Sequence, residues 1–463
     1  IPGIAVAIVK DGQVILKSYG VKELGKNDKV DENTLFMIGS NTKAMTATAL
    51  AMLQEQKKLS LDDKVVKWLP DFKLKDAWVT KEANIRDLLC HRIGMETFQG
   101  DFMYWTSDLS DKQVLDKFGK LTPVYSFRSK WGYTNAAFLA AGQIIPAVTG
   151  KSWADFLTEN IFRPLGMKNT IALSKDLPNA VNKASAHTLD HDQQLIKIPF
   201  CAIDNISPAG SVSSSASDMS KWVMMLLNNG QVNGERVVPV NAIMQTRVPH
   251  SILGNGGHMF NKSNFTLYGL GWMLQDYNGK RMVSHTGGVN GFVSSVTLIP
   301  EDKLGIVVLT NTDNNTLFEA LKYELIDAYL KLPYRNYSNV FLQGNNQQLS
   351  QSKDTWKKKS DTVAMHKATT LPLSAYAGKY QHEVYGSLTI TAASDHLMMS
   401  LEHHPNLKGK LEPLGGNRFA CTYSDPTFGR RVLPFTIENG KVKSMTLSVA
   451  DFVEFTTYEF VKK

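Results

Sequence analysis

A run of apolar residues from Ala44 to Leu53 constrains the fold more than any other stretch of the chain. It is made mostly of Ala, Met and Leu, which form helices well, and it is apolar on nearly every side. Such a helix belongs in a core, covered by other elements. Ser40 follows a glycine just before this run and would start the helix, and Lys43 would lie one turn later on the same face.

The pair Ser40 and Lys43 suggests chemistry at the mouth of that helix. A serine hydroxyl is a poor nucleophile until a base takes its proton. A lysine amine, whose usual pKa is about 10.4, can do so at neutral pH only where burial or a nearby cation lowers that pKa. The helix N-terminus would also stabilise an alkoxide or an oxyanion. The pattern is short, and Ser350 and Lys353 repeat it by chance in a polar stretch.

Composition is that of an ordinary soluble globular protein. The 463 residues suffice for two or three domains, with 43% hydrophobic and 20% charged residues. The net charge of +8 is scattered, which argues against nucleic-acid binding. The three cysteines are far apart and predict neither a disulfide framework nor a zinc site.

The sequence leaves the cellular compartment open. No run approaches the roughly 18 apolar residues that a membrane span requires. The chain opens directly on strand-like residues, Ile1 to Val9, so the lack of a signal peptide says little, and export to the periplasm or the exterior stays one alternative.

Strand-like residues stand at the start of the chain and helical patterns follow. A hairpin is expected at Ile4 to Val9 and Gln13 to Tyr19, around an Asp-Gly turn. From about Asp62 to Gly230 the pattern is mainly helical, and Ser215 to Asp218 looks like a capping box.

Strands return further along the chain. Four runs precede a helix at about Leu317 to Leu330: Gly269 to Leu274, Arg281 to His285, Gly291 to Ile299 and Leu304 to Leu309. Strands from both ends of residues 1–332 would form one antiparallel sheet flanked by helices, beside a mainly helical subdomain. This is an α+β plan.

Two further segments complete the expected organisation. Residues 333–371 are rich in Asn, Gln, Ser and Lys and predict a linker or a loosely packed arm. Residues 372–463 hold many short alternating runs separated by turn residues, which predict a small antiparallel β-barrel domain.

Two other motifs carry candidate chemistry. In Tyr133-Thr134-Asn135 the phenol could relay a proton and the amide could bond a substrate carbonyl; Tyr337 and Asn339 repeat this weak pattern in the linker. In His285-Thr286-Gly287-Gly288, at a strand end, the N–H of Gly288 could pair with that of Ser40 as an oxyanion hole.

In this order the three motifs resemble the serine β-lactamase and penicillin-binding-protein superfamily, in the branch of class C β-lactamases, DD-peptidases, D-aminopeptidases and related esterases. The resemblance covers Ile1 to about residue 330. It extends to less chemical phrases: Ile1-Pro-Gly, Leu88-Leu89-Cys90-His91-Arg92-Ile93-Gly94, Ile161-Phe-Arg-Pro-Leu-Gly-Met, Pro208-Ala-Gly-Ser and Tyr268-Gly-Leu-Gly-Trp. The tail from Leu373 is similar to the lipocalin-like C-terminal domain of some of these hydrolases.

The resemblance implies a role for each motif residue. Ser40 would be the nucleophile, and Lys43 its general base or the partner that lowers a base's pKa. Tyr133 would shuttle a proton, and the N–H groups of Ser40 and Gly288 would form the oxyanion hole. The substrate contacts would be Asn135, His285 and Thr286. An acyl-enzyme would form and be hydrolysed without a metal or an organic cofactor.

One departure bears on the substrate, which would be a small molecule or a peptide. Many β-lactamases and DD-peptidases have Lys-Thr-Gly where this chain has His285-Thr286-Gly287. A largely neutral imidazole holds a carboxylate less well than an ammonium. This favours a peptidase or an esterase over a class C-type β-lactamase. A binding or scaffolding protein with little turnover is the rival hypothesis, and self-association through the C-terminal domain stays open.

Overall fold

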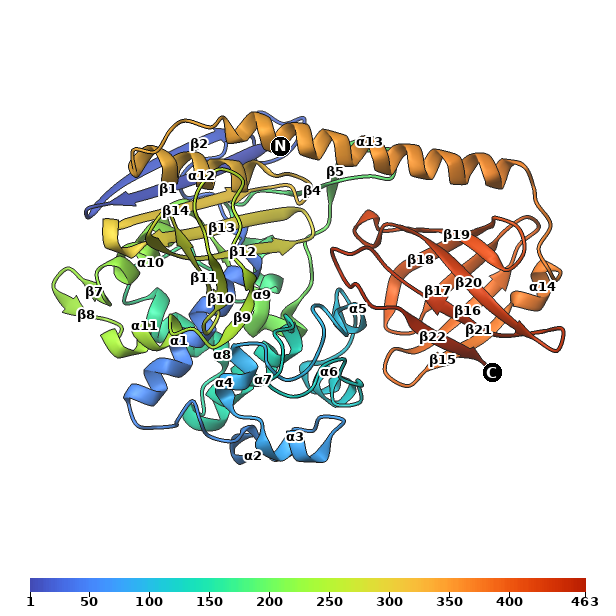
Figure 1. Ribbon diagram of the computed structural model, residues 1–463, viewed down its shortest axis with the longest axis horizontal. Coiled ribbons are helices and arrows are strands. Elements are labelled where there is room, and N and C mark those ends of the chain that lie inside the picture. The colour runs from blue at the N-terminus through green and yellow to red at the C-terminus, as the bar shows by residue number, and fades with distance from the viewer. The chain divides into compact units, whose positions relative to one another are not determined.

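The computed structural model describes all residues, 1–463, and divides into two compact units (Figure 1). Unit 1 comprises residues 1–96, 122–188 and 196–343. Unit 2 comprises residues 97–121, 189–195 and 344–463. The chain therefore leaves unit 1 twice before its final passage into unit 2. No helix is both long and apolar enough to cross a membrane.

Unit 1 is built on one antiparallel sheet of eight strands in the order β2-β1-β14-β13-β12-β11-β10-β9. The first two strands of the chain thus pair with its later ones, as the sequence predicts. The strands are β1 Gly3–Lys10, β2 Gln13–Gly20, β9 Ser251–Asn255, β10 Phe265–Tyr268, β11 Met273–Tyr277, β12 Lys280–Val289, β13 Phe292–Ile299 and β14 Leu304–Thr310.

Helices cover both faces of this sheet. Ile4, Val6 and Ile8 of β1 share one core with Ile306 and with Ile326 of α12, Leu317–Tyr329. Successive side chains alternate between the two faces, and on the other face α10, Ala216–Leu227, packs against β1 and β14. Because helices cover both faces of these central strands, nearly every residue of β1 and β14 is buried.

The helical middle of unit 1 gathers around α1, Thr42–Glu55, which is buried over most of its length as expected for an apolar helix. Short two-stranded pairings join β3 to β6 and β7 to β8. The other elements of this region are α2 Val65–Trp68, α3 Ala77–Glu82, α4 Ile85–Leu89, α7 Asn135–Thr149, α8 Trp153–Leu157, α9 Ser207–Gly210, α11 Val240–Thr246, β3 Phe36–Met37, β4 Ala186–Leu189, β5 Leu195–Ile198, β6 Ser213–Ser214, β7 Gln231–Val232 and β8 Glu235–Arg236.

Two local predictions are corrected. Residues 269–272 form the turn between β10 and β11 instead of a strand, because Gly271 has φ +73 and lies against the main chain of Lys43. Ser215 does cap α10 by accepting from the N–H of Asp218. The helix begins at Ala216, and the carboxylate of Asp218 accepts from the N–H of Asn169 rather than completing a capping box.

Unit 2 contains a closed antiparallel barrel, β15 to β22, which confirms the predicted barrel. Its strands are β15 Gly378–His382, β16 Gly386–Ala392, β17 Leu397–Leu401, β18 His404–Pro413, β19 Arg418–Tyr423, β20 Arg430–Glu438, β21 Lys441–Leu447 and β22 Tyr458–Lys462. The sequence patterns missed β18, where Pro, Gly and Lys hide an alternating burial pattern. Unit 2 also holds α5 Asp101–Tyr104, α6 Asp111–Phe118 and α14 Leu373–Tyr376.

The segment predicted as a linker is largely helical, which the sequence patterns did not predict. α13 runs from Tyr337 to Ala364 and spans 28 residues (Figure 1). Its Gln, Lys and Asp side chains are compatible with a helix, and Lys357 pairs with Asp361 one turn later. Most of its side chains are exposed, so no apolar periodicity announced it.

Candidate active site

Ser40 lies in a 3₁₀ turn, Gly39–Asn41, that joins β3 to α1. The turn is fixed to the sheet because the amide of Asn41 donates to Ser294 Oγ at 2.8 Å, and that hydroxyl donates to the carbonyl of Ile38 at 2.8 Å. Ser40 is partly exposed, whereas Lys43 is fully buried. The hydroxyl therefore stands at the border between solvent and a buried amine.

Glycines bring the end of β12 close to this turn. Gly39 has φ +51, and a Cβ there would lie 2.9 Å from the nitrogen of Gly288. A Cβ on Gly287 would lie only 1.8 Å from the carbonyl oxygen of Ile38. Neither position tolerates a side chain, so glycine is what permits the two backbones to approach.

The Lys43 amine makes three hydrogen bonds that define its geometry. Nζ lies 3.0 Å from Ser40 Oγ, 2.6 Å from Asn135 Oδ1 and 2.8 Å from the carbonyl oxygen of Ala209. Both of the latter atoms can only accept. A neutral amine would use two hydrogens on them and present its lone pair to Ser40.

Tyr133 lies beside the same amine. Nζ of Lys43 stands 4.7 Å from the centre of the Tyr133 ring and 5.4 Å from that of Phe138. Tyr133 precedes α7, and Asn135 is the first residue of that helix. The second motif therefore contributes an aromatic ring and an amide to the surroundings of one nitrogen.

The last residues of β12 leave main-chain groups on the side that β11 does not cover. Pairing with β11 ends at Ser284, whereas pairing with β13 continues beyond it. Asn278 and Gly279 form the turn between β11 and β12, and both have positive φ. Tyr277 and Lys280 flank this turn and form a hydrogen-bonded pair. Along β12, every second residue then directs its main-chain groups to β11 and the residues between direct theirs to β13. Counted from Lys280, the N–H of Gly288 turns away from β13.

His285 is buried at the end of this sheet edge, and both of its ring nitrogens have protein partners. Nδ1 lies 2.6 Å from the carbonyl oxygen of Thr286 and donates to it; Nε2 lies 3.0 Å from the hydroxyl of Tyr268. Burial, with the nearby Lys43 charge, lowers the pKa of His285 to about 3. The imidazole is therefore neutral at physiological pH. Thr286 itself is half-buried.

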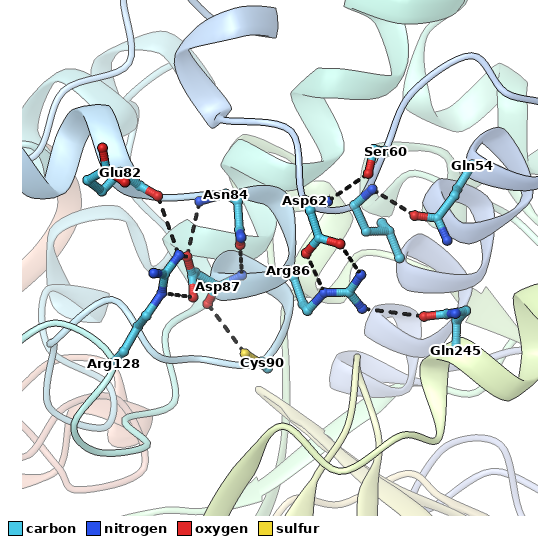
Figure 2. A network of polar contacts seen from close by, with 11 residues as sticks. Gln54, Ser60, Asp62, Glu82, Asn84, Arg86, Asp87, Cys90, Arg128 and Gln245 are labelled. Carbon is cyan, nitrogen blue, oxygen red and sulfur yellow. Dashed lines mark hydrogen bonds and ion pairs between the residues drawn. The ribbon is translucent and has the colours of Figure 1, made fainter.

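A polar network holds the two chain segments that lead to the second motif (Figure 2). Asn84 and Asp87 form a capping box at the start of α4. The carboxylate of Asp87 also binds the guanidinium of Arg128 at 2.7 and 2.9 Å. The N–H of Arg128 donates to the carbonyl of Arg92, and that of Gly132 donates to the carbonyl of His91. The loop before Tyr133 is thus tied to the end of α4.

The structure brings most of the predicted residues together. Ser40, Lys43, Tyr133 and Asn135 share the contacts above, and Gly288 lies against Gly39. Sequence reasoning assigned no role to the carbonyl of Ala209, to His91 or to Tyr268. All three lie in phrases that carried the family resemblance, which was the signal available for them.

Comparison with known proteins agrees with this arrangement. The profile of the Beta-lactamase family matches residues 1–331. The chain belongs to the beta-lactamase family. This confirms the predicted superfamily, and the fold is likewise the predicted α+β plan with a C-terminal barrel. A family described as a domain of unknown function (DUF3471) matches residues 364–462 of this family member.

Relatives and solved structures extend the comparison. The chain is 30% identical to "Unguisins hydrolase ungD'" of Aspergillus campestris, over 84% of the chain and 74% of the relative. It is 26% identical to "Protein flp" of Staphylococcus aureus, over 73% of the chain and 65% of the relative. An octameric penicillin-binding protein homologue from Pyrococcus abyssi shares the fold, with a TM-score of 0.62, 20% identity and coverage of 100% of this chain and 96% of that one. A D-stereospecific amidohydrolase from Streptomyces has a TM-score of 0.56 and 21% identity, covering 68% and 90%.

Proposed function

We propose that this protein is a serine hydrolase that cleaves amide or ester bonds through an acyl-enzyme on Ser40. The observation that carries the proposal is the 3.0 Å separation of Lys43 Nζ and Ser40 Oγ, with two carbonyl oxygens holding the rest of the amine. A buried amine held in this way is suited to take a proton from the hydroxyl beside it.

The proposed course has two halves. Lys43, directly or through Tyr133 beside it, takes the proton of Ser40 while Oγ attacks the substrate carbonyl carbon. The N–H groups of Ser40 and Gly288 bind the resulting oxyanion. Tyr133 then hands a proton to the departing amine or alcohol and takes up the proton held by Lys43, which breaks the scissile bond and leaves an ester on Ser40. Water loses a proton to Lys43 as its oxygen attacks this ester, and that proton passes to Ser40 Oγ as the acid departs.

The third motif supports a peptidase of the D-aminopeptidase kind or an esterase over a dedicated β-lactamase. A lysine at position 285 would offer a cation to a substrate carboxylate. His285 is neutral, and both of its nitrogens are engaged by Tyr268 and Thr286. The resemblance implies Asn135, His285 and Thr286 as the substrate contacts. The names of the unguisins hydrolases and of the D-stereospecific amidohydrolase also point to hydrolysis.

The first test combines labelling with turnover. Intact-mass spectrometry after incubation with a β-lactam should show one adduct, which peptide mapping should place on Ser40. Turnover should be found for nitrophenyl esters or for D- or L-aminoacyl nitroanilides, and should be slow for nitrocefin.

Two variants control this test. Ser40→Ala should abolish both adduct and turnover, while Ser350→Ala, in the chance copy of the motif, should change neither. Fast nitrocefin turnover would make the protein a β-lactamase. No adduct and no turnover in folded protein would instead favour the binding or scaffolding hypothesis.

A further inference from the structure

A chain of hydrogen bonds outside the three motifs connects the second motif with the third. The N–H of Thr134 donates to His91 Nδ1 at 3.0 Å. His91 Nε2 lies 3.3 Å from the hydroxyl of Tyr268, and that hydroxyl lies 3.0 Å from His285 Nε2. His285 Nδ1 ends the chain on the carbonyl of Thr286.

The two ends of the chain fix the direction of every bond in it. A backbone N–H can only donate, so Nδ1 of His91 accepts and Nε2 carries the hydrogen. A carbonyl can only accept, so Nδ1 of His285 carries its hydrogen and Nε2 accepts. Tyr268 therefore accepts from His91 and donates to His285. Burial lowers the pKa of both imidazoles and raises that of the phenol, which keeps all three groups neutral.

The same residues pack on the groups that surround Lys43. The His91 ring lies 4.4 Å from the Tyr133 ring, centre to centre, and 5.2 Å from that of Phe138. Those two rings are the ones that face Nζ of Lys43. His91 has φ +59, a left-handed conformation that favours glycine, so a glycine would fit the backbone here more easily than the imidazole does.

We propose that His91 and Tyr268 are positioning residues. With His285 they form a chain of hydrogen bonds between neutral groups, in which every donor points in the same direction along the chain. This chain sets the tautomers of both imidazoles and holds the Tyr133 loop against the end of β12. This inference rests on the proposed function, because the groups that the chain positions are Tyr133 and, through it, Lys43. It also makes His285 the end of an internal chain instead of a ligand for substrate.

Removing the Tyr268 hydroxyl should interrupt the chain with little loss of packing. Without it the His91 Nε2–H has no acceptor in the chain and His285 Nε2 has no donor. Each ring is then free to change tautomer, and the Tyr133 ring loses the support that fixes it beside Lys43. In this inference none of the three side chains contacts the substrate, so the chemical step should slow while substrate affinity is retained.

The experiment is Tyr268→Phe in the full-length chain, with nitrophenyl ester turnover as the kinetic readout. We expect kcat to fall at least about tenfold and KM to change less than about threefold. Tyr277→Phe is the matched control, because Tyr277 is also buried in unit 1 and its hydroxyl donates to Asp327 at 2.6 Å, outside the site. The control should lose stability and keep its kcat.

A second variant tests whether the residues act as one chain. His91→Asn keeps a residue that tolerates positive φ but cannot span the distance to Tyr268. The double variant of His91→Asn and Tyr268→Phe should have a kcat no lower than that of the slower single variant. Additive losses in kcat would overturn the single chain, as would a Tyr268→Phe variant with unchanged kcat or with a change in KM alone.

Nuclear magnetic resonance of ¹⁵N-histidine-labelled protein reads the tautomers without any substrate. His91 should carry its hydrogen on Nε2 and His285 on Nδ1, and the reverse assignment for either ring would overturn the chain. This readout stands even if Ser40 proves unreactive, which separates failure of the proposed function from failure of this inference.

Discussion

Each of the two units encloses an ionisable side chain that is almost completely buried, and the two sites differ in what surrounds that side chain. Lys43 in unit 1 donates toward Ser40 Oγ, Asn135 Oδ1 and a main-chain carbonyl. Glu454 in unit 2 accepts from the N–H groups of Gly100 and Phe102. Three hydroxyls complete its shell, those of Tyr385, Thr456 and Tyr458.

Burial of an ionisable side chain therefore does not by itself mark an active site. The donors around Glu454 fasten residues 97–121 to the barrel of unit 2. The partners of Lys43 include the hydroxyl of Ser40, which we propose attacks the substrate. The identity of the hydrogen-bond partners, rather than burial, distinguishes the proposed catalytic site around Lys43, the site of chemistry, from the structural site around Glu454, the site of architecture.

The largest expected effect tests the site of chemistry. Lys43→Met removes the proposed base and fills most of its volume with an apolar chain. We expect kcat/KM for a nitrophenyl ester to fall by about 10³-fold or more. The midpoint of thermal unfolding should stay the same or rise, because an apolar chain replaces a buried polar amine.

Lys322 supplies the matched control for that experiment, because it is a second buried lysine of unit 1 and it pairs with Glu319. Lys322→Met should keep its activity and lose stability, since it leaves the carboxylate without its cation. If Lys43→Met keeps its activity, or if both variants lose stability alike, the distinction between the two kinds of buried charge fails.

Sequence patterns predicted those features that depend on local order. The apolar run after Ser40 indicated a buried helix, and α1 is one. The Asp-Gly turn predicted the first hairpin, where Asp11 and Gly12 both have positive φ. The order of the three motifs predicted the superfamily, which the family match confirms.

Other features depend on contacts between residues far apart in the chain, and no local pattern reports them. The link between His91 and Tyr268 spans 177 positions, and the one between Gly100 and Glu454 spans 354. α13 escaped prediction for a different reason: its surface is polar on most sides, so it lacks the apolar stripe by which helices are found. The roles of the site residues stay predictions until the variants are measured.

The second prediction tests the site of architecture. Glu454→Gln places an amide NH₂ among hydrogen-bond donors and should lower the free energy of unfolding of unit 2 by about 2–3 kcal/mol. Ester hydrolysis per folded molecule should be retained. Urea unfolding followed by tryptophan fluorescence measures the change. Glu438→Gln is the control, since its exposed pair with Lys443 should contribute little.

The pH dependence of this loss has a definite sign. Burial raises the pKa of Glu454 above its usual 4.5. Its contribution to stability is therefore complete below the unfolded pKa and declines as pH rises through the folded pKa. Glu454→Gln should cost more at pH 4 than at pH 8, and a cost that grows with pH would show that the carboxylate is bound as an anion.

A histidine in the same unit should show the opposite slope. His404 is buried, its ring stacks on Phe102 at 4.7 Å, and burial lowers its pKa to about 4. Below about pH 6.5 this histidine is protonated in the unfolded chain but stays neutral in the folded chain. The stability that the neutral His404 contributes is therefore present above pH 6.5 and is lost toward pH 4. His404→Gln should reduce the loss between pH 7 and 5 by about 1–2 kcal/mol. An unchanged slope would place the titration elsewhere.

The smallest expected effect comes from an ion pair in the network near α4 (Figure 2). Asp62 binds Arg86 through two bonds of 2.8 and 2.9 Å, yet its side chain is 63% exposed. Asp87 binds Arg128 with similar lengths and is 5% exposed. Water screens the first pair, so Asp62→Asn should cost about 0.5 kcal/mol or less of unfolding free energy. Asp87→Asn should cost several times more, because its carboxylate also caps α4. If Asp62→Asn and Asp87→Asn cost the same unfolding free energy, hydrogen-bond geometry would matter more than burial for these ion pairs. The comparison between the two units would then need another basis.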